Sequence, residues 1–135
     1  MNNEINLLVI DDDEINIFIM KKIMEKTGHN AKMISKTNGK LAIEYLAELI
    51  NNDLPLPNLI LVDINMPVLN GWEFLEQYKT LNIMRNIDMY MLSSSIYEND
   101  MEKAKIFKSV KGFISKPLSI EHLTEIFESI GTEAI

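Results

Sequence analysis

The sequence predicts an α/β fold in which helices wind on both faces of a five-stranded parallel sheet. Short apolar segments alternate with amphipathic segments along the 135 residues, which is typical of repeated strand–helix units. Acidic or polar residues follow several of the apolar segments directly. Right-handed crossovers leave few topologies for such a chain, and a doubly wound sheet of strand order 2-1-3-4-5 is the leading candidate.

Three of the expected strands lie in the first half of the chain. They are residues 5–10, 31–35 and 59–62, where apolar and β-branched residues run together. Apolar residues recur at helical spacing between these strands and predict two amphipathic helices. The first helix ends at Thr27 and Gly28, and the second cannot continue into the proline-bearing segment 51–58. The residues that define the two helical patterns are Ile15, Phe18, Ile19, Ile23, Met24, Ala42, Tyr45, Leu46 and Leu49.

The second half of the chain predicts two more strands, at 87–92 and 112–115. A third helix follows Gly71 and ends near Thr80, and a fourth, weakly amphipathic helix covers about 97–109. Ser119 is the expected N-cap of the last helix. The residues expected to face inward from these helices are Trp72, Phe74, Leu75, Tyr78, Met101, Ala104, Phe107, Ile120, Leu123, Ile126, Phe127 and Ile130.

Length and composition indicate one globular domain over residues 1–135, with its core at about 5–130 and no output domain after it. The chain has no apolar run long enough to span a membrane, no signal-peptide pattern and no cysteine. We therefore expect a cytoplasmic protein without disulfide bonds. A net charge of −7 argues against non-specific nucleic-acid binding, which needs clustered lysine and arginine.

The ends of the expected strands carry a set of charged and polar residues. The carboxyl ends of parallel strands meet at one edge of the sheet, where such sheets bind their ligands. Capping is the simpler explanation for each residue alone, and we expect Asp13 and Glu14 to serve only as helix caps. The residues that the topology gathers are Asp11, Asp12, Asp63, Ser93 and Lys116.

Three carboxylates in one crevice need a counter-charge. Two carboxylates about 4 Å apart repel by roughly 4 kcal/mol at an effective dielectric constant near 20. Oxygen ligands suit a hard cation, so we expect Mg²⁺, for which Mn²⁺ could substitute. A zinc site is not expected, because the chain lacks cysteine and its two histidines, His29 and His122, lie outside the strand ends.

A carboxylate beside Mg²⁺, a hydroxyl group and a lysine suit phosphoryl transfer better than other chemistry. Asp63 would attack the phosphorus in line. Lys116 would neutralise one phosphoryl oxygen, and the hydroxyl of Ser93 would donate a hydrogen bond to another. Nucleotide binding is not expected, since neither glycine-rich phosphate-binding loop is present.

Four segments of the chain resemble the receiver domain of bacterial response regulators. They are Asp11-Asp12, the Val-Asp-x-x-Met-Pro-x-x-x-Gly segment at 62–71, Met-Leu-Ser-Ser at 91–94 and Gly-Phe-Ile-Ser-Lys-Pro at 112–117. The resemblance covers about residues 5–130. It implies a flavodoxin-like (βα)5 fold with strand order 2-1-3-4-5, the topology already favoured.

The resemblance implies roles for the acidic residues. Asp63 would be the phosphoacceptor. Asp12 would bind Mg²⁺ directly, while Asp11 would act largely through water. The backbone carbonyl of Asn65 would complete the protein's share of the metal ligands.

The resemblance also implies a switch. Ser93 matches the switch hydroxyl of the family, Lys116 its lysine and Phe113 its switch aromatic residue. Phe113 stands where tyrosine is common, so its movement would depend on packing alone. Pro117 stands where the family often has a cis peptide bond.

We expect a stand-alone receiver that takes its phosphoryl group from a sensor histidine kinase or a histidine phosphotransfer protein. It would not be an enzyme beyond catalysing its own phosphorylation and dephosphorylation. It would signal to a protein target through the face formed by the fourth helix, the fifth strand and the last helix, with a homodimer possible. Nucleic acid and membranes are not expected partners.

Two alternatives stay open. A degenerate receiver would bind partners without phosphorylation, although all five site residues are present here. A phosphatase with an aspartate nucleophile would need a second aspartate two residues later, where this chain has Asn65, and a cap domain for which the chain has no room.

Overall fold

The computed structural model describes residues 4–66, 68–94 and 98–133. Its strands form one parallel sheet of order β2-β1-β3-β4-β5, which confirms the predicted fold and strand order. The strands are β1 (Ile5–Ile10), β2 (Ala31–Lys36), β3 (Leu59–Asp63), β4 (Asp88–Ser93) and β5 (Val110–Ser115). The helices are α1 (Glu14–Lys26), α2 (Gly39–Asn51), α3 (Gly71–Thr80), α4 (Glu98–Ala104) and α5 (Ile120–Glu133).

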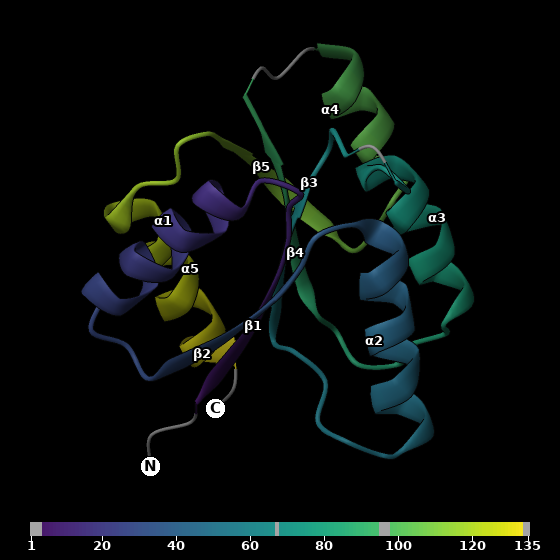
Figure 1. Cartoon of the computed structure of the whole chain (residues 1–135), viewed down its shortest axis with the longest axis horizontal. Helices are drawn as coiled ribbons and strands as arrows, with labels where there is room; N and C mark the ends of the chain where they lie inside the picture. Colours follow the sequence, from purple (N-terminus) through teal and green to yellow (C-terminus); the bar gives the residue numbers. More distant parts are fainter. Residues whose placement is uncertain (1–3, 67, 95–97, 134–135) are drawn as a thin grey trace.

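Helices cover both faces of the sheet, with α1 and α5 on one face and α2, α3 and α4 on the other (Figure 1). Because successive strand residues point to opposite faces, each central strand contributes to two cores. In β3, Ile60 and Val62 pack with α2 and α3, whereas Leu59 and Leu61 pack with α1 and α5. This double burial explains why the central strands are apolar along nearly their whole length.

The helix predicted after the first acidic segment is present as α1, but its buried face differs from the apolar pattern. Met20 and Met24 are its buried residues. Ile15, Phe18 and Ile19 are 72%, 61% and 43% exposed. The spacing therefore predicted the helix correctly, while the sheet and α5 decided which side of it is covered.

The helix predicted over about 97–109 is shorter than expected. Residues 95–97 lie outside the described residues, and α4 ends at Ala104. The N–H of Phe107 then donates to the carbonyl of Ala104 at 2.9 Å, a bond over three residues that tightens the chain. This turn buries Phe107, whose ring stacks on Trp72 with centroids 6.3 Å apart. Met101, which was expected to face inward, is 53% exposed.

Local capping matches the sequence pattern. Asp13 is the N-cap of α1 and accepts hydrogen bonds from the N–H groups of Ile15 and Asn16. The N–H of His122 donates to Oγ of Ser119 at 3.0 Å, which places Ser119 at the start of α5. Within the described ranges, no helix has the length and apolar character needed to cross a lipid bilayer.

Candidate functional site

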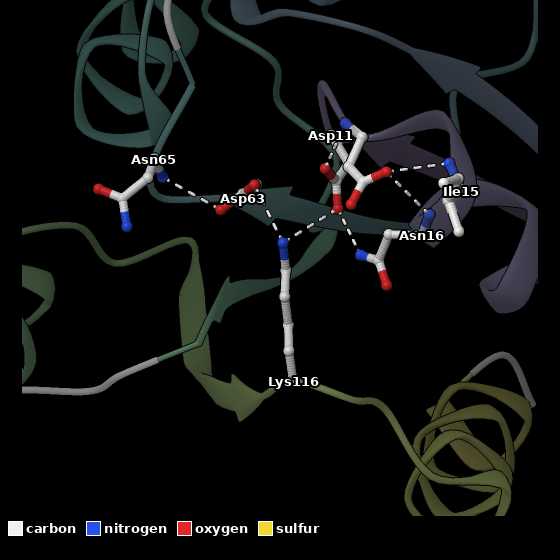
Figure 2. A network of polar contacts seen from close by, with 7 residues as sticks. Asp11, Ile15, Asn16, Asp63, Asn65 and Lys116 are labelled. Carbon is white, nitrogen blue, oxygen red and sulfur yellow. Dashed lines mark hydrogen bonds and ion pairs between the residues drawn. The ribbon is translucent and has the colours of Figure 1, made fainter.

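Three charged side chains meet where β1, β3 and β5 end. Nζ of Lys116 lies 3.1 Å from Oδ2 of Asp63 and 3.2 Å from Oδ2 of Asp11. Figure 2 shows the lysine side chain extending between the two carboxylates, which come from the first and third strands. The structure thus brings together residues that are far apart in the sequence, at the carboxyl edge of the sheet.

The alternation of side chains along the strands explains this meeting. In β1 and β3, Val9 and Leu61 point toward α1 and α5, as does Ile114 in β5. Two residues further on, the same alternation reaches Asp11, Asp63 and Lys116. The three side chains therefore leave the sheet on the same side.

Asp11 is fully buried, and every oxygen of its carboxylate has a partner. Oδ1 accepts a hydrogen bond from the N–H of Asp13 at 2.9 Å. Oδ2 accepts from Nδ2 of Asn16 at 2.6 Å, in addition to its ion pair with Lys116. These donors fix the carboxylate and compensate for the loss of water around it.

Asp63 is 5% exposed, and two donors hold its carboxylate. Oδ1 accepts a hydrogen bond from the N–H of Asn65 at 3.1 Å, while Oδ2 contacts Lys116. Burial raises the pKa of Asp63, and Lys116 and the Asn65 N–H offset this only in part, while Asp11 adds to it. The site therefore holds a carboxylate that is more basic than an ordinary aspartate.

For the pKa of Lys116, the neighbouring charges outweigh the effect of burial. Burial on its own lowers the pKa of Lys116, but the hydrogen bond that Lys116 donates to Asp63 and the charges of Asp11 and Asp63 outweigh this effect. The net direction is upward. Lys116 is therefore a stable cation at neutral pH, placed between two carboxylates.

A metal ion could be held by three carboxylates. Oxygen atoms of Asp11, Asp12 and Asp63 lie within 4.8 Å of one another. Asp12 is exposed, unlike the other two. A group of carboxylates of which one is open to water fits a hard cation such as Mg²⁺, which takes one or two carboxylates and keeps several waters.

The predicted switch residues lie on β4 and β5. Ser93 is 1% exposed and ends β4, and its carbonyl accepts a hydrogen bond from the N–H of Lys116 at 2.9 Å. Phe113 is half-buried and packs against the core formed with α2 and α3. It also lines a hollow of about 160 Å³ between α4 and β5. The Lys116–Pro117 peptide bond is cis.

The first turn of α3 presses against the end of β3. The N–H of Gly71 donates to the carbonyl of Ile64 at 2.9 Å. A Cβ atom at position 71 would lie 2.7 Å from the carbonyl oxygen of Asp63 and 2.8 Å from Cα of Ile64. Asn70 and Glu73 form a reciprocal capping box at the same turn. Glycine is therefore required at position 71 for this close approach.

Two features of the site were missed from the sequence. Asn16, which holds Asp11, could have been suspected as a polar residue in the first turn of a helix that begins beside the acidic residues. The exposed apolar residues of α1 gave no signal, because their spacing is that of an ordinary buried face. His29 packs on Phe127, with ring centroids 5.7 Å apart, just before the amino end of β2 and therefore at the opposite edge of the sheet.

Comparisons with known proteins identify similar chains. Residues 7–128 match the family model of the response regulator receiver domain. The probable methanogenesis regulatory protein FilR2 of Methanothrix harundinacea is 27% identical over 92% of this chain and 79% of its own length. The polar-differentiation response regulator DivK of Brucella anthropi is 25% identical over 92% of this chain and 94% of its own. The crystal structure of a two-component response regulator from Cytophaga hutchinsonii has a TM-score of 0.85 and 32% identity, covering 98% of this chain and 99% of that one.

Proposed function

The chain belongs to the response regulator receiver domain family, and from this we propose that Asp63 is the residue that accepts a phosphoryl group. Phosphorylation of an aspartate, followed by signalling, is the standard function of the family. The donor is a phosphohistidine of a sensor histidine kinase or a histidine phosphotransfer protein. The proposal depends above all on Lys116, which contacts both Asp63 and Asp11 within one group of three carboxylates.

The atoms around Asp63 each have a part in the transfer. The N–H of Asn65 orients the carboxylate, so that one of its oxygens can attack the phosphorus in line. The P–N bond to the donor histidine breaks, and its electron pair stays on the histidine nitrogen. Lys116 neutralises the phosphoryl group as a point charge, and the hydroxyl of Ser93 donates to another phosphoryl oxygen.

Receiver domains bind Mg²⁺ in an acidic pocket, and the carboxylates present here fit that ion. Asp12, Asp63 and the backbone carbonyl of Asn65 are the proposed direct ligands. Asp11, already engaged by three donors, acts by holding Lys116 and ordered water. When bound, Mg²⁺ neutralises charge on the phosphoryl oxygens, and Mn²⁺ can take its place.

The output follows from the connection between the site and β5. Phosphorylation adds about −1.5 to −2 charges beside Lys116. The backbone of Lys116 is bonded to Ser93, so a shift at either residue displaces the end of β5 relative to β4. Phe113 lines the hollow between α4 and β5 and can repack into it. We assign the signalling surface to this α4–β5–α5 face, where a protein target or a second copy would bind.

The input surface is assigned to α1. Ile15, Phe18 and Ile19 are large apolar residues left exposed on α1, which begins two residues after Asp12. Figure 2 shows Ile15 next to Asp11 and Asn16. A donor protein has to bring its phosphohistidine to Asp63, and an apolar face beside the site provides a place for its helices to pack.

Intact-mass measurement with acetyl phosphate and Mg²⁺ tests the proposal. The protein should gain one phosphoryl group, and Asp63→Asn should gain none. Asp53→Asn, which changes an exposed aspartate, is the matched control and should behave as the unmodified protein. A folded protein that gains no mass would be a degenerate receiver, and a gain that survives Asp63→Asn would place the acceptor elsewhere.

A further inference from the structure

A groove of about 260 Å³ lies between α3 and the connection 105–109 that joins α4 to β5. We call it the α3 groove. Its apolar lining includes Leu75 and Phe107, which are 1% and 6% exposed, and Ile106, which is 68% exposed. It therefore has a buried apolar floor and an exposed apolar rim, with room for one side chain of the size of leucine or phenylalanine.

The charged residues that line the α3 groove are both lysines, in a chain of net charge −7. Within the described residues, Lys108 forms no ion pair. The ion pair that Lys79 forms in the same part of the chain is a long one, at 4.0 Å, with the exposed Glu76. The groove thus has a local charge opposite to that of the whole protein, which favours an anionic ligand.

The hydroxyl of a mostly buried tyrosine adds to this preference. Tyr78 lines the α3 groove and is 7% exposed. Its hydroxyl has no hydrogen-bond partner in the part of the chain that the structure describes. Ser109 contributes a second hydroxyl to the lining. The groove therefore offers several hydrogen-bond donors beside an apolar floor.

The floor of the α3 groove is held in place before any ligand binds. The ring of Phe107 stacks on Trp72, and Nζ of Lys79 lies 5.3 Å from its centroid. Nζ of Lys103 lies 4.8 Å from the ring of Trp72 on the same surface. A rigid, preorganised pocket loses less freedom on binding than a mobile one.

We propose that the α3 groove binds an acidic segment of a partner protein, with one leucine or phenylalanine of that segment inserted between Leu75 and Phe107. Its carboxylates pair with Lys79 and Lys108 at the rim, and the Tyr78 hydroxyl donates to a peptide carbonyl or a carboxylate. The groove is formed without Asp63, so this interaction is independent of the proposed phosphorylation.

The test titrates the ¹⁵N-labelled whole chain with two end-blocked peptides and follows its amide signals by ¹H–¹⁵N NMR. The peptides are Glu-Asp-Leu-Phe-Glu-Asp and Glu-Asp-Ser-Ser-Glu-Asp. The first peptide should shift the amides of Tyr78, Phe107 and Ser109 in a saturable way. The serine peptide should bind at least about fivefold more weakly, because it keeps the charges but loses the anchor. Equal binding of both peptides would overturn the proposal.

Charge variants test the rim. Lys79→Glu with Lys108→Glu should weaken binding of the first peptide by about tenfold at low salt, because two attractive contacts become repulsive. Lys21→Glu with Lys32→Glu is the matched control, with the same change in net charge on exposed residues elsewhere, and should bind as the parent protein does. Asp63→Asn should also bind normally. Equal weakening by both double variants, shifts confined to another face, or no saturable binding would each refute the groove as the binding site.

Discussion

Lys116 crosses the end of β4 to reach Asp63, with 3.1 Å between Nζ and Oδ2. The two residues are 53 positions apart in the sequence and belong to the ends of strands that are not neighbours in the sheet. The same nitrogen also contacts Asp11, which directly follows the end of β1. One ammonium group therefore links the ends of three strands and compensates two buried carboxylates.

Replacing Lys116 should destabilise the protein in a way that Mg²⁺ corrects. Lys116→Met leaves Asp11 and Asp63 facing each other without a cation, and we expect a loss of about 2 kcal/mol at neutral pH. Urea denaturation with and without MgCl₂ measures the free energy of unfolding. Mg²⁺ should recover part of the loss by binding the folded state. Lys111→Met is the control, because Lys111 also pairs with a buried carboxylate, that of Asp88 at 3.5 Å, but at the other end of the strands. An effect of equal size that Mg²⁺ leaves unchanged would contradict this account of the site.

The raised pKa of Asp63 predicts the direction in which the free energy of unfolding changes with pH. The folded protein holds this proton more tightly than the unfolded chain does. Its contribution to stability is therefore complete below the ordinary pKa of 3.8 and is lost as pH rises through the raised value. Asp63→Asn cannot ionise, so its stability relative to the parent should increase from about pH 4 toward neutrality.

Denaturation curves of the parent, Asp63→Asn and Asp53→Asn across this range measure the difference. Asp53→Asn, at an exposed residue, controls for the loss of one carboxylate. Added Mg²⁺ should reduce the pH dependence of the stability difference between the parent and Asp63→Asn. A relative stability of Asp63→Asn that falls with rising pH would show that Lys116 lowers the pKa of Asp63 below its ordinary value.

Gly71→Ala should damage both the fold and the site. The added Cβ would lie 2.7 Å from the backbone oxygen of Asp63, and backbone atoms cannot move aside as the end of a flexible side chain can. We expect a loss of about 2 kcal/mol in unfolding free energy, together with slower phosphorylation by acetyl phosphate. Gly112→Ala is the control, since its Cβ would find its nearest neighbour, the ring of Tyr90, at 3.7 Å. Similar losses for the two variants would mean that crowding at position 71 is not the cause.

Substitutions on the exposed face of α1 should slow docking of the donor protein without affecting the phosphorylation reaction itself. Ile15→Ser with Phe18→Ser should slow phosphoryl transfer from a phosphorylated histidine phosphotransfer domain by roughly tenfold, because two apolar contacts are lost. Phosphorylation by acetyl phosphate should stay unchanged, since that donor needs no docking surface. Met84→Ser, at a residue that is 97% exposed, controls for the loss of an exposed apolar side chain. Equal slowing with both donors would mean that the variant disturbs the site itself.

Much of the fold could be predicted because its signals are local. The central strands β1, β3 and β4 are short, mostly apolar runs, and α1, α2 and α3 begin at the capping residues Asp13, Asn38 and Asn70. The face that α1 buries and the early end of α4 could not be predicted this way. Both depend on packing partners that are distant in the sequence, including the stacking of Phe107 on Trp72.

The residue types at the strand ends can be read from the amino-acid sequence: Asp11 and Asp12, Asp63, Ser93 and Lys116. Their pairing depends on how the strands pack together, which places Lys116 between Asp11 and Asp63 and leaves Asp12 exposed. The alternation of side chains along parallel strands sends Asp11 and Asp63 to the same side of the sheet, whereas Asp12 lies past the end of β1 and brings an exposed carboxylate to the same group. The strand order then brings the three strand ends within reach of one lysine, which no property of a single segment could establish.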